Sequence, residues 1–331
     1  MSEIAVSAPA RLHFGMLDPV GLGPRRFGGF GVGVQWPRVL VSVRAVSGRE
    51  VRARGPQAER AATFARQARA ALGVRGGLEV VVREAIPAHQ GLGSGTKLAL
   101  AIARAVSELA GAGADPALLA QASGRGMRSS VGCWTFDAPG LVVEAGVRGG
   151  EIGPLIARVP MPAAWRCVLA LPRGGEGLSG EAEERFFARC EALPRHEPPV
   201  ARLLLTALLP GLQRGDIEEF GVALSAIQRE IGAIFAARQG GIFHPCSSGV
   251  VRALEALGAR AVGQSSWGPT VYAIAESPER ATALAEGLRG SIGRQAEVRV
   301  VDFDRHGAQL VRSEGVGGDG AGGVRKREVV A

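Results

Sequence analysis

The sequence of 331 residues contains little cysteine, few aromatic residues and almost no lysine. Its four cysteines stand far apart and form no CxxC pair, which argues against a disulfide framework or a zinc site and fits a reducing cytoplasm. Aromatic residues make up 5% of the chain, too few for a platform on which nucleic-acid bases stack. Basic residues form a block only in the tail segment "VRKRE", so we expect no nucleic-acid partner.

Long apolar runs and a leader sequence are also missing. No apolar run reaches the roughly 18 residues that a membrane helix needs, and the first residues lack the layout of a signal peptide. The expectation is a cytoplasmic protein without a membrane partner. The net charge of +8 comes from scattered arginines and favours an anionic small-molecule substrate. A GC-rich coding bias is the alternative explanation for this composition.

The 46% of hydrophobic residues suffice for two cores. Segments typical of strands and helices alternate, which predicts an α+β fold. The segment "GPLIARVPMPAAW" separates two patterns of elements, so we predict a first domain over residues 1–155 and a second over 160–305. The glycine-rich residues 313–331 are predicted to be a disordered tail.

A glycine-rich loop, "GLGSGT", precedes an apolar run typical of a helix. Gly91, Gly93 and Gly95 allow close backbone approach, and the backbone N–H groups of such a loop, with the following helix N-terminus, can converge on an anion. The side chains of Ser94, Thr96 and Lys97 could add hydrogen bonds, metal ligation and a charge. The alternative is a plain turn in which Ser94 caps the helix.

Four motifs carry a resemblance to a known family: "PARLHFGMLDPVG" with "GGFGVGV", "HQGLGSGTKLALA", "GRGMRSSVGCWTF" and "VGQSSWGPTVYA". The second motif resembles the phosphate-binding loop of the GHMP kinase superfamily. Together they resemble the β-ribofuranosylaminobenzene 5′-phosphate synthases within it. The resemblance implies a GHMP kinase-like fold, with an N-terminal domain like domain 2 of ribosomal protein S5 and a ferredoxin-like C-terminal domain.

The resemblance also implies a reaction. Such synthases condense 5-phosphoribosyl 1-diphosphate with 4-aminobenzoate or a close 4-substituted benzoate, release pyrophosphate and CO2, and serve tetrahydromethanopterin biosynthesis. A departing diphosphate calls for hydrogen-bond donors and for Mg²⁺ as the expected cofactor. A homodimer is a further expectation.

Several residues are candidates for this chemistry. Asp18, Arg25 and Arg26 are the predicted catalytic residues, because a carboxylate beside arginines suits an acceptor with an amine and a carboxylate. Arg125 and Arg128 are expected to bind phosphate, against the alternative of a surface loop. The polar segment Gln264, Ser265, Ser266 and Trp267 is expected to face the phosphate loop, with Trp267 stacking on the aromatic substrate; a half-buried β-turn is the alternative. Ser94, Thr96 and Glu181 are the candidate metal ligands.

Two other functions stay open at this point. A small-molecule GHMP kinase would use ATP, but kinases of the superfamily carry a serine where this chain has Gly95. A catalytically silent binding protein on the same fold is the third hypothesis, and the presence of several independent polar motifs argues against it.

Overall fold

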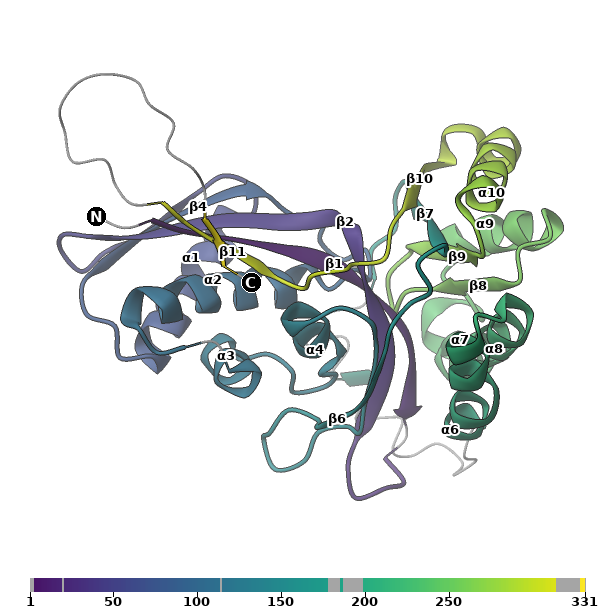
Figure 1. Cartoon of the computed structure of the whole chain (residues 1–331), viewed down its shortest axis with the longest axis horizontal. Helices are drawn as coiled ribbons and strands as arrows, with labels where there is room; N and C mark the ends of the chain where they lie inside the picture. Colours follow the sequence, from purple (N-terminus) through teal and green to yellow (C-terminus); the bar gives the residue numbers. More distant parts are fainter. Residues whose placement is uncertain are drawn as a thin grey trace.

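A computed structural model describes residues 3–19, 21–113, 115–177, 185–186, 199–313 and 328–330. Two halves lie side by side, each built around its own sheet (Figure 1). The predicted α+β fold is confirmed, and the strands of the two sheets do not form one continuous parallel sheet.

The first half holds an eight-stranded sheet in which the long strands β1 and β2 form the centre. Its strand order is β12-β11-β1-β2-β4-β3, and β5 and β6 extend from the other end of β2. Helices α1 and α2 pack on this sheet and on each other. Its elements are β1 (Glu3–Asp18), β2 (Phe27–Val46), β3 (Val51–Arg54), α1 (Ala58–Ala71), β4 (Gly77–Glu84), α2 (Ser94–Ala110), α3 (Pro116–Ser123), α4 (Val131–Asp137), β5 (Leu141–Glu144) and β6 (Leu155–Val159).

The second half is a four-stranded sheet in the order β10-β7-β9-β8. Numbered along this half, the order is 4-1-3-2 with antiparallel neighbours, which is the ferredoxin-like arrangement that the family resemblance implies. Its elements are β7 (Arg166–Pro172), α6 (Val200–Leu203), η1 (Leu204–Leu208), α7 (Leu209–Arg214), α8 (Ile217–Gln239), α9 (Pro245–Ala256), β8 (Ala261–Gln264), β9 (Val271–Ala275), α10 (Pro278–Ile292), η2 (Gly293–Gln295) and β10 (Ala296–Val301).

Alternation along β7 explains how two cores meet at this sheet. Cys167 and Leu169 belong to the large core that is shared with the first half, whereas Val168 and Ala170 belong to the core under α9 and α10. Successive side chains of a strand point to opposite faces, so a sheet that is covered on both sides needs apolar residues at every position. The two halves are therefore joined by packed side chains.

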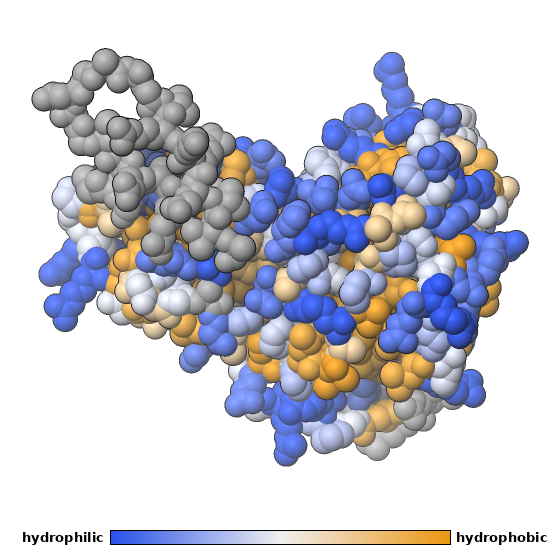
Figure 2. Space-filling model, viewed as in Figure 1, coloured by the Kyte–Doolittle hydropathy of each residue, from blue (hydrophilic) through white to orange (hydrophobic). Residues whose placement is uncertain are grey.

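Helix α8 is long and apolar enough, by length and composition, to cross a membrane. Arg229 and Glu230 interrupt its apolar sequence, so the expectation that no uninterrupted apolar run reaches 18 residues is not contradicted. Half of its most apolar 18-residue window is buried inside the protein, and the helix packs on β8 and β1. Hydrophilic and hydrophobic residues also mix over the face of the molecule in Figure 2. A helix with one buried face of this kind is typical of a helix that packs on the core of a globular protein.

After β10 the chain returns to the first half. Strand β11 (Gln309–Ser313) pairs antiparallel with the start of β1, and β12 (Glu328–Val330) pairs with β11. Of the predicted disordered tail, Ser313 and residues 328–330 lie in these strands, and the rest lies outside the described residues, so the disorder stays a prediction. The remaining domain boundaries stay predictions.

Candidate active site

The glycine-rich loop runs directly into the N-terminus of α2. Gly91 and Gly93 have φ angles of 75° and 78°, a backbone region that glycine enters without the penalty of a Cβ atom. Strand β1 holds the loop in place, because the Arg11 N–H donates to the Leu92 carbonyl at 3.1 Å and the Arg11 guanidinium donates to the Gly91 carbonyl. The first turn of α2 contains no acidic residue, so its free N–H groups suit an anion.

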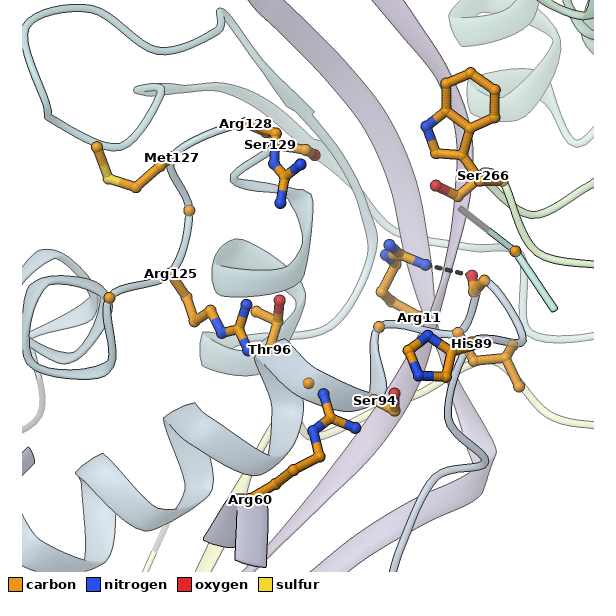
Figure 3. Close-up of a pocket in the computed structure, with 18 residues that line it drawn as sticks. Arg11, Arg60, His89, Ser94, Thr96, Arg125, Met127, Arg128, Ser129 and Ser266 are labelled. Atoms are coloured by element: carbon orange, nitrogen blue, oxygen red, sulfur yellow. Dashed lines mark hydrogen bonds between the residues drawn. The ribbon is translucent and has the colours of Figure 1, made fainter. Parts of the chain in front are cut away.

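The loop forms one wall of a cavity of about 250 Å³. Four guanidinium groups point into this space, from Arg11, Arg60, Arg125 and Arg128 (Figure 3). Among its described lining residues there is no carboxylate. The lining consists of Arg11, Arg60, His89, Gly91, Leu92, Gly93, Ser94, Gly95, Thr96, Gly124, Arg125, Gly126, Met127, Arg128, Ser129, Gly177, Ser266 and Trp267. Such a cavity suits a ligand with several negative charges.

Arg60 and Arg125 lie on either side of the position where kinases of the superfamily carry a serine. A Cβ atom at Gly95 would lie 2.6 Å from Nη2 of Arg60 and 3.1 Å from Nη2 of Arg125. Both guanidiniums lie over the Phe64 ring, at 5.9 and 4.9 Å. Burial lowers the pKa of both arginines, and the charge of Arg60 lowers that of Arg125 further. Two repelling cations held together without a carboxylate in the cavity favour an anionic ligand between them.

The "GQSSWGPT" segment crosses the glycine loop, as predicted. The Ser265 hydroxyl donates to the Gly91 carbonyl at 2.6 Å and accepts the His13 N–H at 3.0 Å. The two backbones touch, since a Cβ at Gly91 would lie 2.0 Å from the Ser265 carbonyl oxygen, and one at Gly268 would lie 2.0 Å from the Gly91 nitrogen. Ser265 is fully buried, so it positions the loop and has no open path to a ligand. Ser266 does line the cavity.

A second, smaller cavity of about 30 Å³ adjoins the first, and Ser266 and Trp267 line both. Trp267 stacks on Phe235, with ring centroids 4.0 Å apart, so this face of the indole is closed to an aromatic substrate. The Gln264 side chain accepts the His244 N–H at 2.6 Å and donates to the Ser266 carbonyl at 3.1 Å. Gln264 therefore shapes the turn between the two cavities.

Lys97 does not reach the cavity, so the predicted contact with phosphate is wrong. It is fully buried on the core face of α2, and its Nζ lies 3.0 Å from Oγ1 of Thr135. Burial lowers the pKa of Lys97 to about 7, partly offset by Asp304. Lys97 stands three and four residues before the buried Leu100 and Ala101, so all three lie on one face of the helix. This spacing in the sequence already indicates that Lys97 faces the core.

Asp18, Arg25 and Arg26 are not brought to this cavity. The Asp18 carboxylate accepts the N–H groups of Gly21, Leu22 and Gly23 at 2.7 to 3.0 Å, which fixes the turn between β1 and β2. Asp18 and Arg25 line a separate hollow, and Arg26 lies over the ring of Phe27. Along an extended strand, Asp18 lies about 16 Å from His13. Their catalytic role stays a prediction.

The cavity residues that the sequence did not predict include three with polar side chains: Arg60, His89 and Ser129. Arg11, His89 and Ser129 stand inside the motifs that carry the resemblance, and His89 lies two residues before Gly91 of the loop. His89 has a φ of 58°, a conformation that is uncommon outside glycine and that concentrates at functional sites. Glu181, the third candidate metal ligand, lies outside the described residues.

Comparisons with known proteins agree with this arrangement. Models of the GHMP kinases N-terminal domain and of the GHMP kinases C-terminal domain match residues 58–140 and 208–292. The chain is 30% identical over 296 residues to β-ribofuranosylphenol 5′-phosphate synthase of Methanothermobacter thermautotrophicus, covering 83% of this chain and 89% of that protein. For the Archaeoglobus fulgidus protein of the same name, the identity is 32% and the coverages are 83% and 88%.

The chain belongs to the β-ribofuranosylphenol 5′-phosphate synthase family. This membership makes it a synthase-type enzyme of the GHMP kinase superfamily, as the motifs predict. Its fold is also that of the superfamily's kinases. Homoserine kinase from Cytophaga hutchinsonii superposes with a TM-score of 0.68 at 18% identity, over 93% of this chain and 97% of the kinase. At that identity the likeness shows the fold alone. A β-ribofuranosylphenol 5′-phosphate synthase therefore shares its fold with kinases, and its different function must come from differences in the site, such as Gly95 and the arginines beside it.

Proposed function

We propose that the chain condenses 5-phosphoribosyl 1-diphosphate with a 4-substituted benzoate, releasing pyrophosphate and CO2, in tetrahydromethanopterin biosynthesis. The enzyme would be a phosphoribosyl-transferring, decarboxylating synthase. The proposal rests on the family membership and on the chemistry of the arginine-lined cavity. One observation carries it: the Arg60 and Arg125 guanidiniums occupy the space beside Gly95.

Glycine in place of serine at position 95 changes the chemical groups that the loop presents to a ligand. In a kinase of the superfamily, a serine at this position lies near the metal and the transferred phosphoryl group. Here two cations stand within 2.6 and 3.1 Å of where such a side chain would begin. Guanidiniums bind phosphate oxygens through paired N–H donors. The site is therefore suited to accept the charge of a departing diphosphate.

The other residues would support the same step. As the bond between the anomeric carbon and the diphosphate breaks, negative charge grows on the leaving group and positive charge on the sugar. The four guanidiniums and the N-terminus of α2 are fixed before the reaction, so they stabilise the leaving group without reorganising. The ring carbon that bears the carboxylate then attacks the anomeric carbon, and loss of CO2 restores the aromatic ring.

The names of the relatives bear on the acceptor. They refer to a ribofuranosylphenol, whereas the sequence motifs favoured 4-aminobenzoate. We therefore propose 4-hydroxybenzoate as the preferred acceptor and keep 4-aminobenzoate as the second one to test. Either acceptor is a carboxylate, which suits a cavity lined by cations.

The expected Mg²⁺ finds no fitting protein ligands in the described part of the site. Mg²⁺ is usually held by one or two carboxylates together with substrate phosphates. Ser94 and Thr96 offer hydroxyl groups, but the described lining offers no carboxylate, and no group of three or more His, Cys, Asp or Glu among the described residues could hold a metal. We propose that the guanidiniums do most of the charge neutralisation and that any Mg²⁺ arrives with the diphosphate substrate.

The test supplies the purified chain with phosphoribosyl diphosphate, Mg²⁺ and carboxyl-labelled 4-hydroxybenzoate or 4-aminobenzoate, without ATP. Release of labelled CO2 and an equal amount of pyrophosphate is the expected result. ADP formation with an alcohol substrate, and no CO2 without ATP, would move the assignment to a kinase. Turnover in neither assay would favour the binding protein. The cytoplasmic location and the homodimer remain predictions, to be checked by fractionation and light scattering.

A further inference from the structure

A buried carboxylate lies behind the wall of the main cavity. Glu144, the last residue of β5, is fully buried. One of its oxygens accepts the Ser130 N–H at 3.1 Å, and the other accepts the Gly146 N–H at 2.7 Å. Among the described residues, no cation forms an ion pair with it, and burial raises the pKa of this carboxyl. A carboxylate that is buried without a cation is unfavourable for folding and calls for a functional explanation.

Two glycines of β2 make room for the segment that Glu144 holds. Gly29 pairs with Glu144 across β2 and β5, and Gly31 follows two residues later on the same face of the sheet. A Cβ atom at Gly31 would lie 3.0 Å from Cγ1 of Val131, the first residue of α4. The start of α4 can therefore approach the sheet closely enough for the Ser130 N–H to reach the carboxylate.

The connection between β5 and β6, residues 145–154, holds the same segment from the other side. The Ser130 hydroxyl accepts the Gly153 N–H at 2.7 Å and donates to the Gly126 carbonyl at 3.2 Å. A Cβ atom at Gly153 would collide with Oε2 of Glu144. Carboxylate, connection and segment 126–130 are therefore in direct contact, and the carboxylate joins the other two.

This segment carries Arg128 into the main cavity (Figure 3). Arg128 stands two residues before Ser130, and the neighbouring Met127 is 44% exposed, so the tip of the segment packs little against the rest of the protein. On the other side of Arg128, the Ser129 hydroxyl oxygen lies 2.9 Å from Nε2 of His13, on β1. The position of the Arg128 backbone is therefore set by the contacts of Ser129 and Ser130.

Arg125 lines the same cavity but is held by other elements. Its N–H donates to the Ala120 carbonyl at 2.9 Å, at the end of α3. Its guanidinium lies over the ring of Phe64, on α1, at 4.9 Å. Neither of the two hydrogen bonds of Glu144 is made to Arg125 or to its immediate neighbours. Arg125 is thus an internal reference for any effect that is transmitted from Glu144.

We propose that Glu144 is a positioning residue of the synthase, which holds Arg128 in place to bind a phosphate group of phosphoribosyl diphosphate. The inference rests on the proposed function. Glu144 is not among the residues that line the cavity, so it acts through the segment that carries Arg128. A guanidinium that is fixed before binding loses less conformational entropy when it meets the ligand. A glutamine at position 144 would accept only one N–H, and its amide N–H group would face the other.

Double-mutant cycles test this link, with calorimetry of phosphoribosyl diphosphate in the absence of an acceptor. E144Q should lower the affinity about tenfold or more, as expected when the charged hydrogen bonds of one guanidinium are lost. R128M removes the same contribution, so E144Q/R128M should bind within about twofold of R128M. In E144Q/R125M, by contrast, the losses of the two single variants should multiply.

Steady-state kinetics separate positioning from a loss of folded protein. E144Q should raise KM for phosphoribosyl diphosphate by a similar factor and leave KM for the aromatic acceptor within about twofold. A smaller folded fraction would instead lower kcat and leave both KM values unchanged. S107A is the matched control, because Ser107 is fully buried, donates to the Gly113 carbonyl and is not among the cavity residues.

A second variant covers the case in which E144Q does not fold. E144D keeps the charge, but its side chain is one carbon shorter and cannot reach both N–H groups. It enters the same two cycles, and the same pattern is expected: no further loss with R128M and multiplied losses with R125M.

Several results would overturn the inference. They are an E144Q or R128M affinity within about twofold of wild type, losses that multiply in both cycles, and losses that multiply in neither, which would mean that Glu144 shapes the whole cavity. A rise in KM for the acceptor alone would also contradict it. Wild-type protein that does not bind phosphoribosyl diphosphate would reject the proposed function together with the inference, whereas binding with failed cycles would reject the inference alone.

Discussion

The two adjoining cavities differ in the polarity of the residues that line them. The main cavity presents guanidiniums, hydroxyls and backbone N–H groups, whereas the small one is lined mostly by aromatic, aliphatic and amide side chains. They share the turn that carries Ser266 and Trp267. The difference teaches that one site can place a polar, positively charged lining directly beside a mostly apolar one. Residues of one cavity can therefore be substituted while the lining of the other cavity stays unchanged for comparison.

The largest expected effect comes from removing two cations of the main cavity. In R60M/R125M we expect the affinity for phosphoribosyl diphosphate to fall at least about 100-fold, because a hydrogen bond to a charged group contributes about 1.5–3 kcal/mol and 1.4 kcal/mol is tenfold. Isothermal titration calorimetry measures it. R104M is the matched control, since Arg104 pairs with Glu108 on α2 at 2.9 Å and is not among the cavity residues. A loss below threefold in the double variant would remove the arginine wall from the binding site.

A smaller effect is expected where the shared turn crosses the glycine loop. In G268A the new Cβ would meet the Gly91 nitrogen at 2.0 Å, so the two loops must separate. We expect a loss of roughly 1–3 kcal/mol in the free energy of unfolding, together with weaker binding of both substrates. G249A is the control, because that exposed helical position has open space around it and alanine should stabilise it slightly. Urea unfolding compares the two, and an unchanged midpoint in G268A would disprove the tight crossing.

The smallest effect concerns a cation that belongs to neither cavity. Lys97 has a pKa near 7 in the folded chain and about 10.4 when unfolded, so between these values the unfolded chain binds more protons. Wild-type stability should therefore rise with pH above 7, and the full cost of burying the charge is present below it. We expect K97M to be more stable by on the order of 1 kcal/mol at pH 6, with an advantage that shrinks by pH 9. Parallel stability curves, or a change in diphosphate affinity beyond twofold, would contradict this account.

The fold was largely predictable, because its signals are local. Alternating apolar residues predicted the strands. A capping residue directly before a proline is typical of a helix start, and the structure has a side-chain cap at both Asp115 before Pro116 and Ser277 before Pro278. The glycine loop and its contact with "GQSSWGPT" were also predicted correctly. The position of Arg60 in the cavity could not be predicted, because its local sequence does not distinguish it from the other arginines of α1. The packing of α1 beside α2 places it next to Gly95.

The chemistry of the small cavity was harder to predict for a related reason. Its walls include Phe235 and Ile231 from α8, which follow the ordinary spacing of a buried helix face. Apolar residues around an opening of this size have the same sequence pattern as a solid core. The contact of His13 with Ser129 spans 116 positions of sequence, and no sequence spacing encodes such a contact.

The return of β11 to β1 has a consequence for synthesis on the ribosome. Residues 3–7 pair with residues 309–313, so this part of β1 is synthesised long before the strand that it pairs with. Until then, this part of β1 has an open edge that another chain could pair with. A nascent chain stalled before residue 309 should therefore need a chaperone more than the finished chain does.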